Sequence, residues 1–443
     1  MADWKFIALL ATSGIVNFWL AKMIIKKEDE SFNRRFLFYT GLIFNIGILL
    51  YFKYFNFFIQ SFVTLFNYSD SVNISFTPFH ILLPLGISFF TFQMIGYLID
   101  VDKEEIEPTN DYLSFFTYLA YFPKLLSGPI EKAQDFLPQI QRKRQFNYDL
   151  AVDGLRQILW GLFKKIVIAN SLTALVNIIF NDYQNLSSST LIFGSIFYTI
   201  SLYADFSGYS DMACGVSKLF NIKITNNFAF PFFSTNISDF WKKWHISLTS
   251  WMMNYVYAPI SFITREYKKF GLIISINFTF LLVGLWHGAN WTFVIFGLYQ
   301  GLLFIPLIFK GAILKNKKIM VNKFGLPSLN DFFKIIGTFL LVSFGMIIFR
   351  AENVEHAIGY ISGMFKHPGS YLLLSTYTTY VTTHSLVFIF LIIEWFGRQQ
   401  EYALQHIDVF KNVILRWFVY FVMVVAILFM SQNTPQEFIY FAF

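Results

Sequence analysis

The stretch Gly271-Leu-Ile-Ile-Ser-Ile-Asn-Phe-Thr-Phe-Leu-Leu-Val-Gly-Leu-Trp-His287 ends an apolar run with a histidine. A second histidine stands upstream, in Phe240-Trp-Lys-Lys-Trp-His245-Ile-Ser-Leu. Imidazole is the side chain whose ordinary pKa permits proton transfer near neutral pH. Placing an ionisable group in hydrocarbon costs free energy, so an intramembrane histidine is first interpreted as a functional residue. The sequence therefore predicts a histidine-containing core within residues 231–301, built around His245 and His287.

The composition excludes an ordinary soluble protein. Of 443 residues, 56% are hydrophobic and only 14% are charged, whereas soluble proteins carry about 25% charged residues. The net charge of +7 comes from basic residues in short loops between apolar runs, as the positive-inside rule describes, and does not indicate nucleic-acid binding. Cys214 is the single cysteine, so an intrachain disulfide and a cysteine-based metal cluster are both excluded. The chain is predicted to be an all-α polytopic membrane protein that partners the lipid bilayer.

Apolar runs follow one another along the whole chain without a long polar insertion. Since a span needs about 20 apolar residues, we expect about ten or eleven transmembrane helices plus re-entrant helices, within one integral domain over residues 1–443. Tyr112–Leu126 is short, and Pro123 and Pro129 interrupt the sequence at its end, which indicates a re-entrant or interfacial element. Lys53 interrupts the apolar run Phe36–Phe66, so this run is predicted to form either one long tilted helix or a helix with a break. The predicted spans are Phe6–Ile25, Phe36–Phe66, Pro78–Asp100, Leu150–Phe180, Thr190–Leu219, Gly271–Trp286, Trp291–Phe309, Asp331–Phe349, Tyr371–Phe396 and Val413–Met430.

The orientation follows from the basic loops. Lys26, Lys27, Arg34 and Arg35 come after the first span, which places that loop inside and the N-terminus outside. The first span lacks a positive leader and a small-residue cleavage site, so we expect a retained helix and not a signal peptide.

The run that precedes His287 is short. Gly271–Trp286 covers roughly 24 Å at about 1.5 Å per residue, less than the ~30 Å hydrocarbon core. His287 is therefore predicted to lie at depth. Gly284 and Gly288 allow close approach of backbone or ligand, and Trp286 and Trp291 can wall a pocket.

The polar residues within the apolar runs can have an ordinary structural role instead of a chemical one. His245 follows Lys242 and Lys243 and lies between two tryptophans, where an interfacial side chain is unremarkable. Asp205 and Asp211 can serve a transporter as ion or proton ligands, but packing against Ser, Tyr or backbone groups is favoured. Lys164 and Lys165 are expected near the inner headgroups, where they can snorkel.

Several other kinds of site have no support in the sequence. No glycine-rich phosphate loop, Ser-His-Asp order or metal-ligand spacing appears, so no metal is expected. A loop or helix-end position and no chemistry are expected for four other histidines, His356, His367, His384 and His406.

Around the two histidines the sequence resembles the membrane-bound O-acyltransferase family, in particular its bacterial branch that acts in alginate and peptidoglycan O-acetylation and teichoic-acid D-alanylation. The phrases that carry the resemblance are Phe240–Leu248, Gly284–Phe293, Leu83–Gln93, Phe122–Pro129, Asp205–Met212 and Phe438–Phe443. They extend over about residues 83–443. The sequence departs from the branch after Trp251, where Met253 and Asn254 replace an Arg-Asp pair, and at Ala442 in place of glutamine.

The resemblance implies a fold and an activity. It implies an O-acyltransferase that moves an acyl group, most simply acetyl, from a cytoplasmic thioester across the bacterial inner membrane for O-acylation of a cell-envelope or secreted polysaccharide. The donor is acetyl-CoA or an acyl-carrier thioester, with no tightly bound cofactor, and the expected partner is an extracytoplasmic SGNH-type acyltransferase or another secreted protein. The near-invariant family histidine matches His287, and the second active-site histidine matches His245.

Further roles follow from that implied reaction. His287 is expected to act as general base, with His245, Asn290 or a backbone N–H near Gly288 as oxyanion donor; transient acylation of a histidine is the alternative. Lys242, Lys243 and Asn290 are expected to contact the donor. The two lysines would attract its anionic groups, although the positive-inside bias also explains them. The competing function is a proton-coupled transporter or flippase that uses the intramembrane His and Asp residues. The motif set and the absence of paired halves favour the enzyme.

Overall fold

The computed structural model describes residues 4–431 apart from 30, 68–73, 314–318, 320, 324, 367, 370–376 and 410, and it describes no side chains for 377–382. Within this part of the chain the regular structure is helical, without a β-strand. The chain divides into two compact units, Met1–Gln145 with Gly288–Asn290, and Phe146–His287 with Trp291–Phe443. That both belong to one integral domain stays a prediction.

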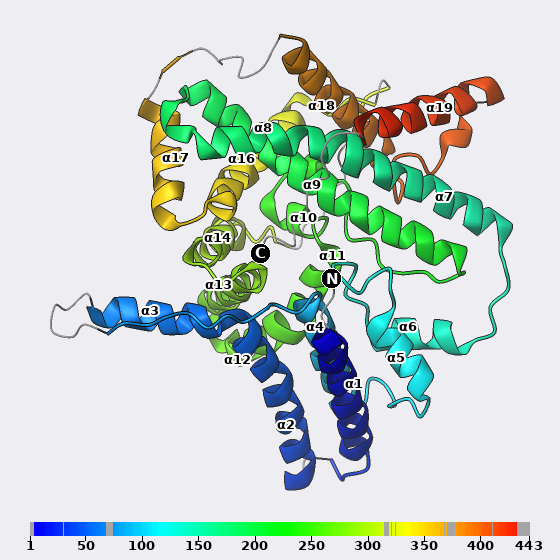
Figure 1. The fold of residues 1–443 in the computed structure, drawn as a ribbon, viewed down its shortest axis with the longest axis vertical. Helices are drawn as coiled ribbons and strands as arrows, with labels where there is room; N and C mark the ends of the chain where they lie inside the picture. The colour runs from blue at the N-terminus through cyan, green and yellow to red at the C-terminus, as the bar shows by residue number, and fades with distance from the viewer. Residues whose placement is uncertain are drawn as a thin grey trace. The chain divides into compact units, whose positions relative to one another are not determined.

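The first unit contains the helices drawn in blue and cyan in Figure 1. A π-helical segment, η1 (Leu50–Tyr54), joins α2 to α3, so that the helical run Phe32–Asn67 is continuous but irregular at Lys53. The sequence had left open a tilted helix or a broken one. The α-helices are α1 (Trp4–Ile25), α2 (Phe32–Leu49), α3 (Phe55–Asn67), α4 (Ile87–Asp102), α5 (Tyr112–Ala120) and α6 (Ala133–Gln141).

Polar pairs hold the first unit together. Asn17 of α1 and Asn45 of α2 are fully buried and exchange side-chain hydrogen bonds of 3.1 and 2.7 Å. Arg34 is buried in the first turn of α2 and donates to Glu104 at 2.9 Å. The assignment of Arg34 to a loop was therefore wrong, because α2 begins at Phe32.

The second unit contains the remaining helices. They are α7 (Tyr148–Leu162), α8 (Asn170–Asn181), α9 (Ser188–Leu219), α10 (Ile237–Trp241), α11 (Ile246–Met252), α12 (Ala258–Ile263), α13 (Lys268–His287), α14 (Trp291–Leu302), α15 (Ile305–Phe309), α16 (Leu329–Arg350), α17 (Val354–Lys366), α18 (Tyr377–Gly397) and α19 (Val413–Met430). The π-helical segments are η2 (Phe163–Ala169), between α7 and α8, and η5 (Met253–Tyr257). The 3₁₀ turns are η3 (Tyr183–Asn185), η4 (Pro231–Phe233), η6 (Arg265–Tyr267) and η7 (Ile407–Val409).

Seven helices among the described residues are long and apolar enough to cross a membrane. They are Trp4–Ile25, Phe32–Asn67, Tyr148–Asn181, Arg265–His287, Trp291–Phe309, Leu329–Arg350 and Val413–Met430. Three other predicted spans correspond to α4, α9 and α18; α4 and the described apolar part of α18 are short, and α9 does not reach the same apolarity. The chain is thus an all-α multi-pass membrane protein.

Two predicted boundaries were wrong. The run from Pro78 becomes helical only at Ile87, because Gly86 has a left-handed backbone (φ 72°) and lies so close to Leu125 that a Cβ would meet its carbonyl oxygen at 2.3 Å. The helix before His287 has 20 residues and not the shorter length expected, because it starts at Lys268 and includes His287. At about 30 Å this helix matches the hydrocarbon core, so the argument that a short span holds His287 at depth fails.

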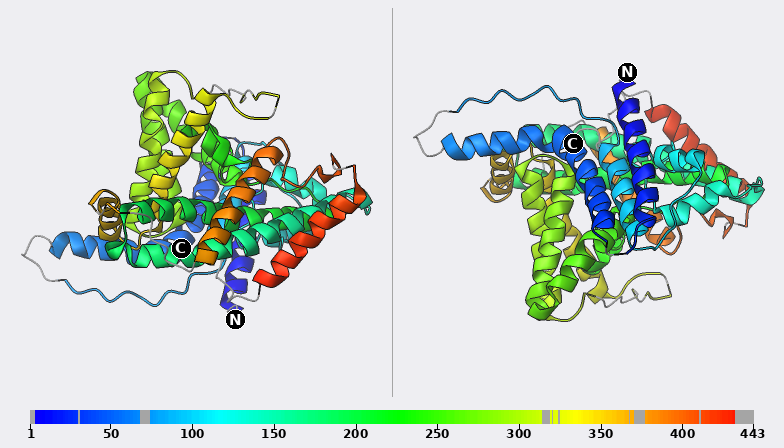
Figure 2. Two further views of the ribbon diagram at one scale, coloured as in Figure 1. Left: turned by 90° about the horizontal axis from the view of Figure 1, so that it is seen from above. Right: turned by 90° about the horizontal axis from the view of Figure 1, so that it is seen from below.

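Helices α7 and α9 pack antiparallel through two glycine pairs, and Figures 1 and 2 show them side by side. A Cβ on Gly154 would lie 2.6 Å from the carbonyl oxygen of Gly215, and a Cβ on Gly161 would lie 2.6 Å from that of Gly208. Small residues at such interfaces let membrane helices approach closely, which increases van der Waals packing between them.

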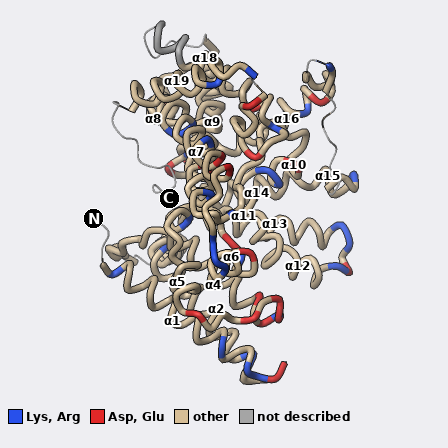
Figure 3. The backbone as a smooth tube through the Cα atoms, turned by 90° about the vertical axis from the view of Figure 1, so that its right-hand side faces the viewer, with Lys and Arg blue, Asp and Glu red and all other residues tan. Residues whose placement is uncertain are grey.

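The α13–α14 hairpin uses the same device. A Cβ on Gly284 would lie 2.1 Å from the carbonyl oxygen of Phe293, and a Cβ on Gly297 would lie 2.2 Å from that of Phe280. Gly284 therefore admits the backbone of α14. Figure 3 shows charged residues at the turn from α12 to α13, where Arg265, Lys268 and Lys269 lie.

Candidate active site

His287 is the last residue of α13 and is buried among aromatic rings. Its ring centroid lies 4.9 Å from that of Trp286 and 4.9 Å from that of Phe349 on α16, both at edge-on angles. Phe296 of α14 approaches at 6.4 Å. Three helices of the second unit thus enclose this imidazole.

His245 is held in a strained turn. It is the residue before α11, with φ 45° and ψ 54°, and only 1% of its surface is exposed. A left-handed backbone is uncommon for a residue other than glycine and persists only where the surroundings enforce it, often at functional sites. The aromatic ring of Phe206 on α9 packs edge-on against the imidazole at 4.7 Å.

A buried asparagine builds that turn. The backbone carbonyl of Asn227 accepts the N–H of Ile246 at 2.9 Å, while its side-chain oxygen accepts the hydroxyl of Ser247 at 2.6 Å and its N–H at 3.3 Å. Ala229 N–H donates to the carbonyl of Lys243 at 3.0 Å. The sequence reading missed Asn227, because a lone asparagine in an aromatic segment gives no signal for a partner that lies about 20 residues downstream.

Trp286 brings the two predicted histidines together. Its ring lies 5.5 Å from the ring of His245 and 4.9 Å from that of His287, so both imidazoles border one indole. Trp286 is buried and Trp291 is 52% exposed, and the prediction that they wall a pocket stays a prediction.

The other predicted site residues lie nearer the surface. Lys242 is exposed and donates to the carbonyl of Ile313 at 3.4 Å. Lys243 is half-buried and pairs with Asp239, four residues earlier, at 2.9 Å. Asn290 is half-buried in the turn between α13 and α14. Their proposed contact with the donor stays a prediction.

The two aspartates of α9 have partners that the sequence did not suggest. Asp205 pairs with Lys165, and Asp211 accepts from Lys164 at 2.6 Å and from Gln157 at 2.9 Å. The favoured packing role is consistent with these pairs, but lysines and not hydroxyls supply them. Lys164 is 2% exposed, so its predicted snorkelling position was wrong.

Glu394 is a further buried polar residue that the sequence reading missed. It lies in the apolar helix α18 and accepts from the hydroxyl of Tyr203 on α9 at 2.5 Å. A single carboxylate inside an apolar run was the available signal. Tyr203 in turn packs against Phe232 at 4.7 Å and lies near Trp244 at 6.1 Å.

Three other histidines that the structure describes have ordinary surroundings. His356 of α17 stacks on Tyr183 at 4.8 Å and shares a 3.1 Å hydrogen bond with the carbonyl of Phe180; burial lowers its pKa. His384 contacts Phe197, His406 is exposed, and His367 lies outside the described residues. The terminal motif Phe438–Phe443 also lies outside them.

Two imidazoles enclosed by aromatic rings can accept and return protons with little competition from water. Such surroundings also strengthen any dipole that points at a developing charge, because the local dielectric is low. The fold and this pair define the class: a multi-pass membrane protein with a buried two-histidine site.

The comparisons name the family. The model of the membrane-bound O-acyltransferase family, MBOAT, matches residues 102–347, which include both histidines. The chain is 33% identical over 414 residues to the probable alginate O-acetylase AlgI of Pseudomonas aeruginosa, covering 90% of this chain and 75% of that protein. The chain belongs to the membrane-bound O-acyltransferase family, and it is an acyltransferase.

Two other relatives are named for different polymers. The peptidoglycan O-acetyltransferase of Helicobacter pylori is 33% identical over 387 residues, covering 81% of this chain and 70% of the relative. The teichoic acid D-alanyltransferase of Bacillus subtilis is 28% identical over 295 residues, covering 63% of this chain and 71% of the relative.

Proposed function

We propose that this acyltransferase takes an acetyl group from a cytoplasmic thioester, acetyl-CoA or an acyl-carrier thioester, and delivers it across the bacterial inner membrane for O-acetylation of a cell-envelope or secreted polysaccharide. The observation that carries the proposal is the meeting of His245 and His287 at Trp286. Relatives named for alginate and peptidoglycan O-acetylation support acetyl as the group. A secreted SGNH-type partner is proposed to complete the delivery to the polymer.

In the proposed reaction His287 is the general base. Its imidazole takes the proton of the acceptor hydroxyl while that oxygen attacks the thioester carbonyl, and the carbon–sulfur bond then breaks. The imidazolium returns the proton to the departing thiolate, which leaves the enzyme unchanged. General-base assistance of this kind contributes about 10²–10⁴-fold.

His245 is proposed to stabilise the oxyanion that forms on the carbonyl. It borders the same indole as His287 but comes from a separate, rigid turn. A donor that is fixed before reaction needs no reorganisation as charge develops. Asn290, in the turn after His287, is a second proposed donor.

The direction of transfer rests on the charges of the short loops. Lys242 is exposed, and Arg265, Lys268 and Lys269 lie at the start of the helix that ends in His287. By the positive-inside rule this end faces the cytoplasm, and the N-terminus faces outward. The same lysines are proposed to attract the phosphates of coenzyme A.

Sealed vesicles of known orientation test the function. Labelled acetyl-CoA is supplied to one face and a hydroxyl-bearing glycan to the other, with His287→Ala vesicles as the control. Transfer only when donor is on the lysine-rich face supports the proposal. Uptake of intact acetyl-CoA, or transfer that persists in His287→Ala, contradicts it.

A further inference from the structure

Helix α9 presents two neighbouring residues to two different elements. The ring of Phe206 packs on His245 at 4.7 Å. The preceding residue, Asp205, is 2% exposed and pairs with Lys165 of the π-helical segment η2. Successive residues of an α-helix project about 100° apart, since a turn has about 3.6 residues. The ion pair and the ring contact therefore restrain the rotation of α9 from two directions.

The π-helical segment explains how two adjacent lysines both reach α9. Its i→i+5 bonding widens the turn, so successive side chains diverge less than in an α-helix, and such segments are frequent at functional sites. Lys164 donates to Ser207 at 2.8 Å and pairs with Asp211 at 2.6 Å, while Lys165 pairs with Asp205. These contacts bracket Phe206 along α9.

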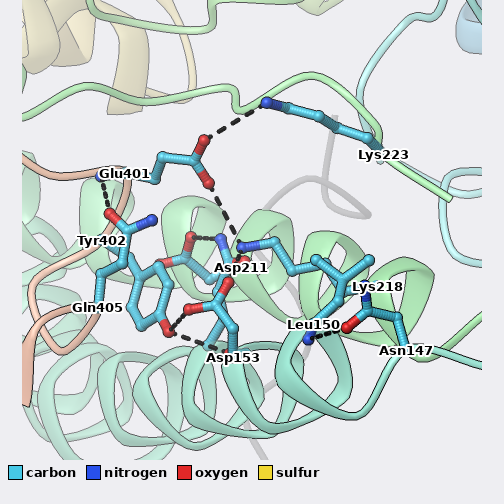
Figure 4. Close-up of polar contacts among 10 residues, drawn as sticks. Asn147, Leu150, Asp153, Asp211, Lys218, Lys223, Glu401, Tyr402 and Gln405 are labelled. Carbon is cyan, nitrogen blue, oxygen red and sulfur yellow. Dashed lines mark hydrogen bonds and ion pairs between the residues drawn. The ribbon is translucent and has the colours of Figure 1, made fainter. Parts of the chain in front are cut away.

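The contact between α7 and α9 carries a second ion pair, far from His245. Lys218 of α9 pairs with Asp153 of α7 at 2.5 Å, and Figure 4 shows Tyr402 and Glu401 beside them. Lys218 lies about 18 Å beyond Phe206 along α9 at about 1.5 Å per residue. Asp153 is more exposed than Asp205, and Lys218 also pairs with Glu401 at 3.4 Å, so Asp153→Asn serves as a control for the loss of an ion pair on α9 and not for the loss of an equally buried one.

We propose that the Lys165–Asp205 ion pair is a positioning device for His245: it sets the rotation of α9 at which Phe206 presses against the imidazole. This inference rests on the proposed function for its catalytic consequence. The imidazole sits in a strained left-handed turn, so the contact with Phe206 restrains a residue that its own backbone does not favour. Asp205 and Lys165 act through Phe206 and are positioning residues.

Steady-state kinetics on purified, monodisperse variants test the catalytic part, with transfer of label from acetyl-CoA as the readout. For Asp205→Asn we expect kcat to fall at least about tenfold with KM nearly unchanged, because misplacing a catalytic group by about 1 Å can cost about 10²-fold. Exchanging the charges, Lys165→Asp with Asp205→Lys, is expected to recover most of kcat. Asp153→Asn is expected to keep kcat within about twofold.

Phe206→Leu gives an independent arm, because it keeps the ion pair and removes the ring contact. It is expected to lower kcat as Asp205→Asn does. If Asp205→Asn fails to fold, Phe206→Leu and the charge exchange decide the matter. A kcat of Phe206→Leu within about twofold of wild type, or equal losses in Asp205→Asn and Asp153→Asn, overturns the proposal.

A second readout does not depend on activity. Diethyl pyrocarbonate modification of His245, followed by peptide mass spectrometry with exposed His406 as the reference, reports how tightly the imidazole is held. The rate at His245 should rise in Asp205→Asn and stay unchanged in Asp153→Asn; an unaltered rate in Asp205→Asn overturns the proposal. If the wild type transfers no label at all, the proposed function fails, while the labelling result still judges the positioning.

Discussion

The two histidines of the site are supported in opposite ways. His287 ends a 20-residue helix, so regular backbone hydrogen bonding places its side chain. His245 sits in a left-handed turn between short helices and depends on Asn227 and on the ring of Phe206. A helix end tolerates local change because its register is set along many turns. The turn that holds His245 depends on a few individual contacts, so substitutions outside the site should displace the His245 side chain more readily than that of His287.

The largest expected effect is that of His287→Ala. Removal of the proposed base should abolish acyl transfer, a loss of at least about 10²–10⁴-fold, while helix α13 remains intact. Polymer acetylation in cells that contain equal amounts of protein measures it. Exposed His406→Ala is the control, and near-normal acetylation in His287→Ala would falsify the assignment.

His245→Asn separates chemistry from backbone strain. Asparagine tolerates the left-handed conformation, so this variant should fold while transfer falls by about 10²-fold, as when one oxyanion donor is removed. We expect more residual activity than in His287→Ala. Activity equal to wild type in the same cell assay, with normal protein levels, would remove His245 from the mechanism.

Asn227→Ala tests the support of the turn. It removes the acceptor for Ser247 and should lower the free energy of unfolding by about 1–3 kcal/mol. The rate should fall less than in His245→Asn, because the imidazole remains. Asn227→Asp keeps an acceptor oxygen and should retain more activity than Asn227→Ala. Thermal unfolding in detergent and transfer assays measure both, and no difference between Asn227→Ala and wild type contradicts the asymmetry.

The smallest expected effect comes from the spacing of α7 and α9. A Cβ on Gly161 would lie 2.6 Å from the carbonyl oxygen of Gly208, so Gly161→Ala should push the helices apart and lower the free energy of unfolding by about 1 kcal/mol. Gly47 has no heavy atom within 4 Å of a built Cβ, so Gly47→Ala is the matched control. The melting temperatures of the two purified variants test this prediction. Equal melting temperatures for Gly161→Ala and Gly47→Ala would contradict it.

The predicted spans show where local sequence suffices. Val413–Met430 has the boundaries that were predicted, because an uninterrupted apolar run in lipid has few alternatives to a helix. The start of α4 was missed, because Gly86 adopts its left-handed backbone against Leu125, about 40 residues away. The start of α13 was missed because Lys268 and Lys269 are helical although charged.

The site divides in the same way. His245 and His287 were predicted from their cost in a membrane and from their motifs, and the structure brings both to Trp286. Lys164 was misplaced because exposure depends on which helix face a neighbour covers. Asn227 and Phe206 carry no chemical signal of their own.

Composition by itself determined that this protein is a helical membrane protein with functional histidines among its spans, because hydrocarbon penalises each polar group wherever it stands in the chain. The acyltransferase activity followed from the resemblance of its motifs to a known family, which the comparisons confirm. Tertiary structure alone decided which partners serve those groups. Asp205 pairs with Lys165 where paired glycines let α7 and α9 pack at backbone contact, and Phe206 contacts His245 where the turn before α11 packs against α9. Such pairings depend on helix rotation and spacing, which are set by the packing of segments far apart in the sequence.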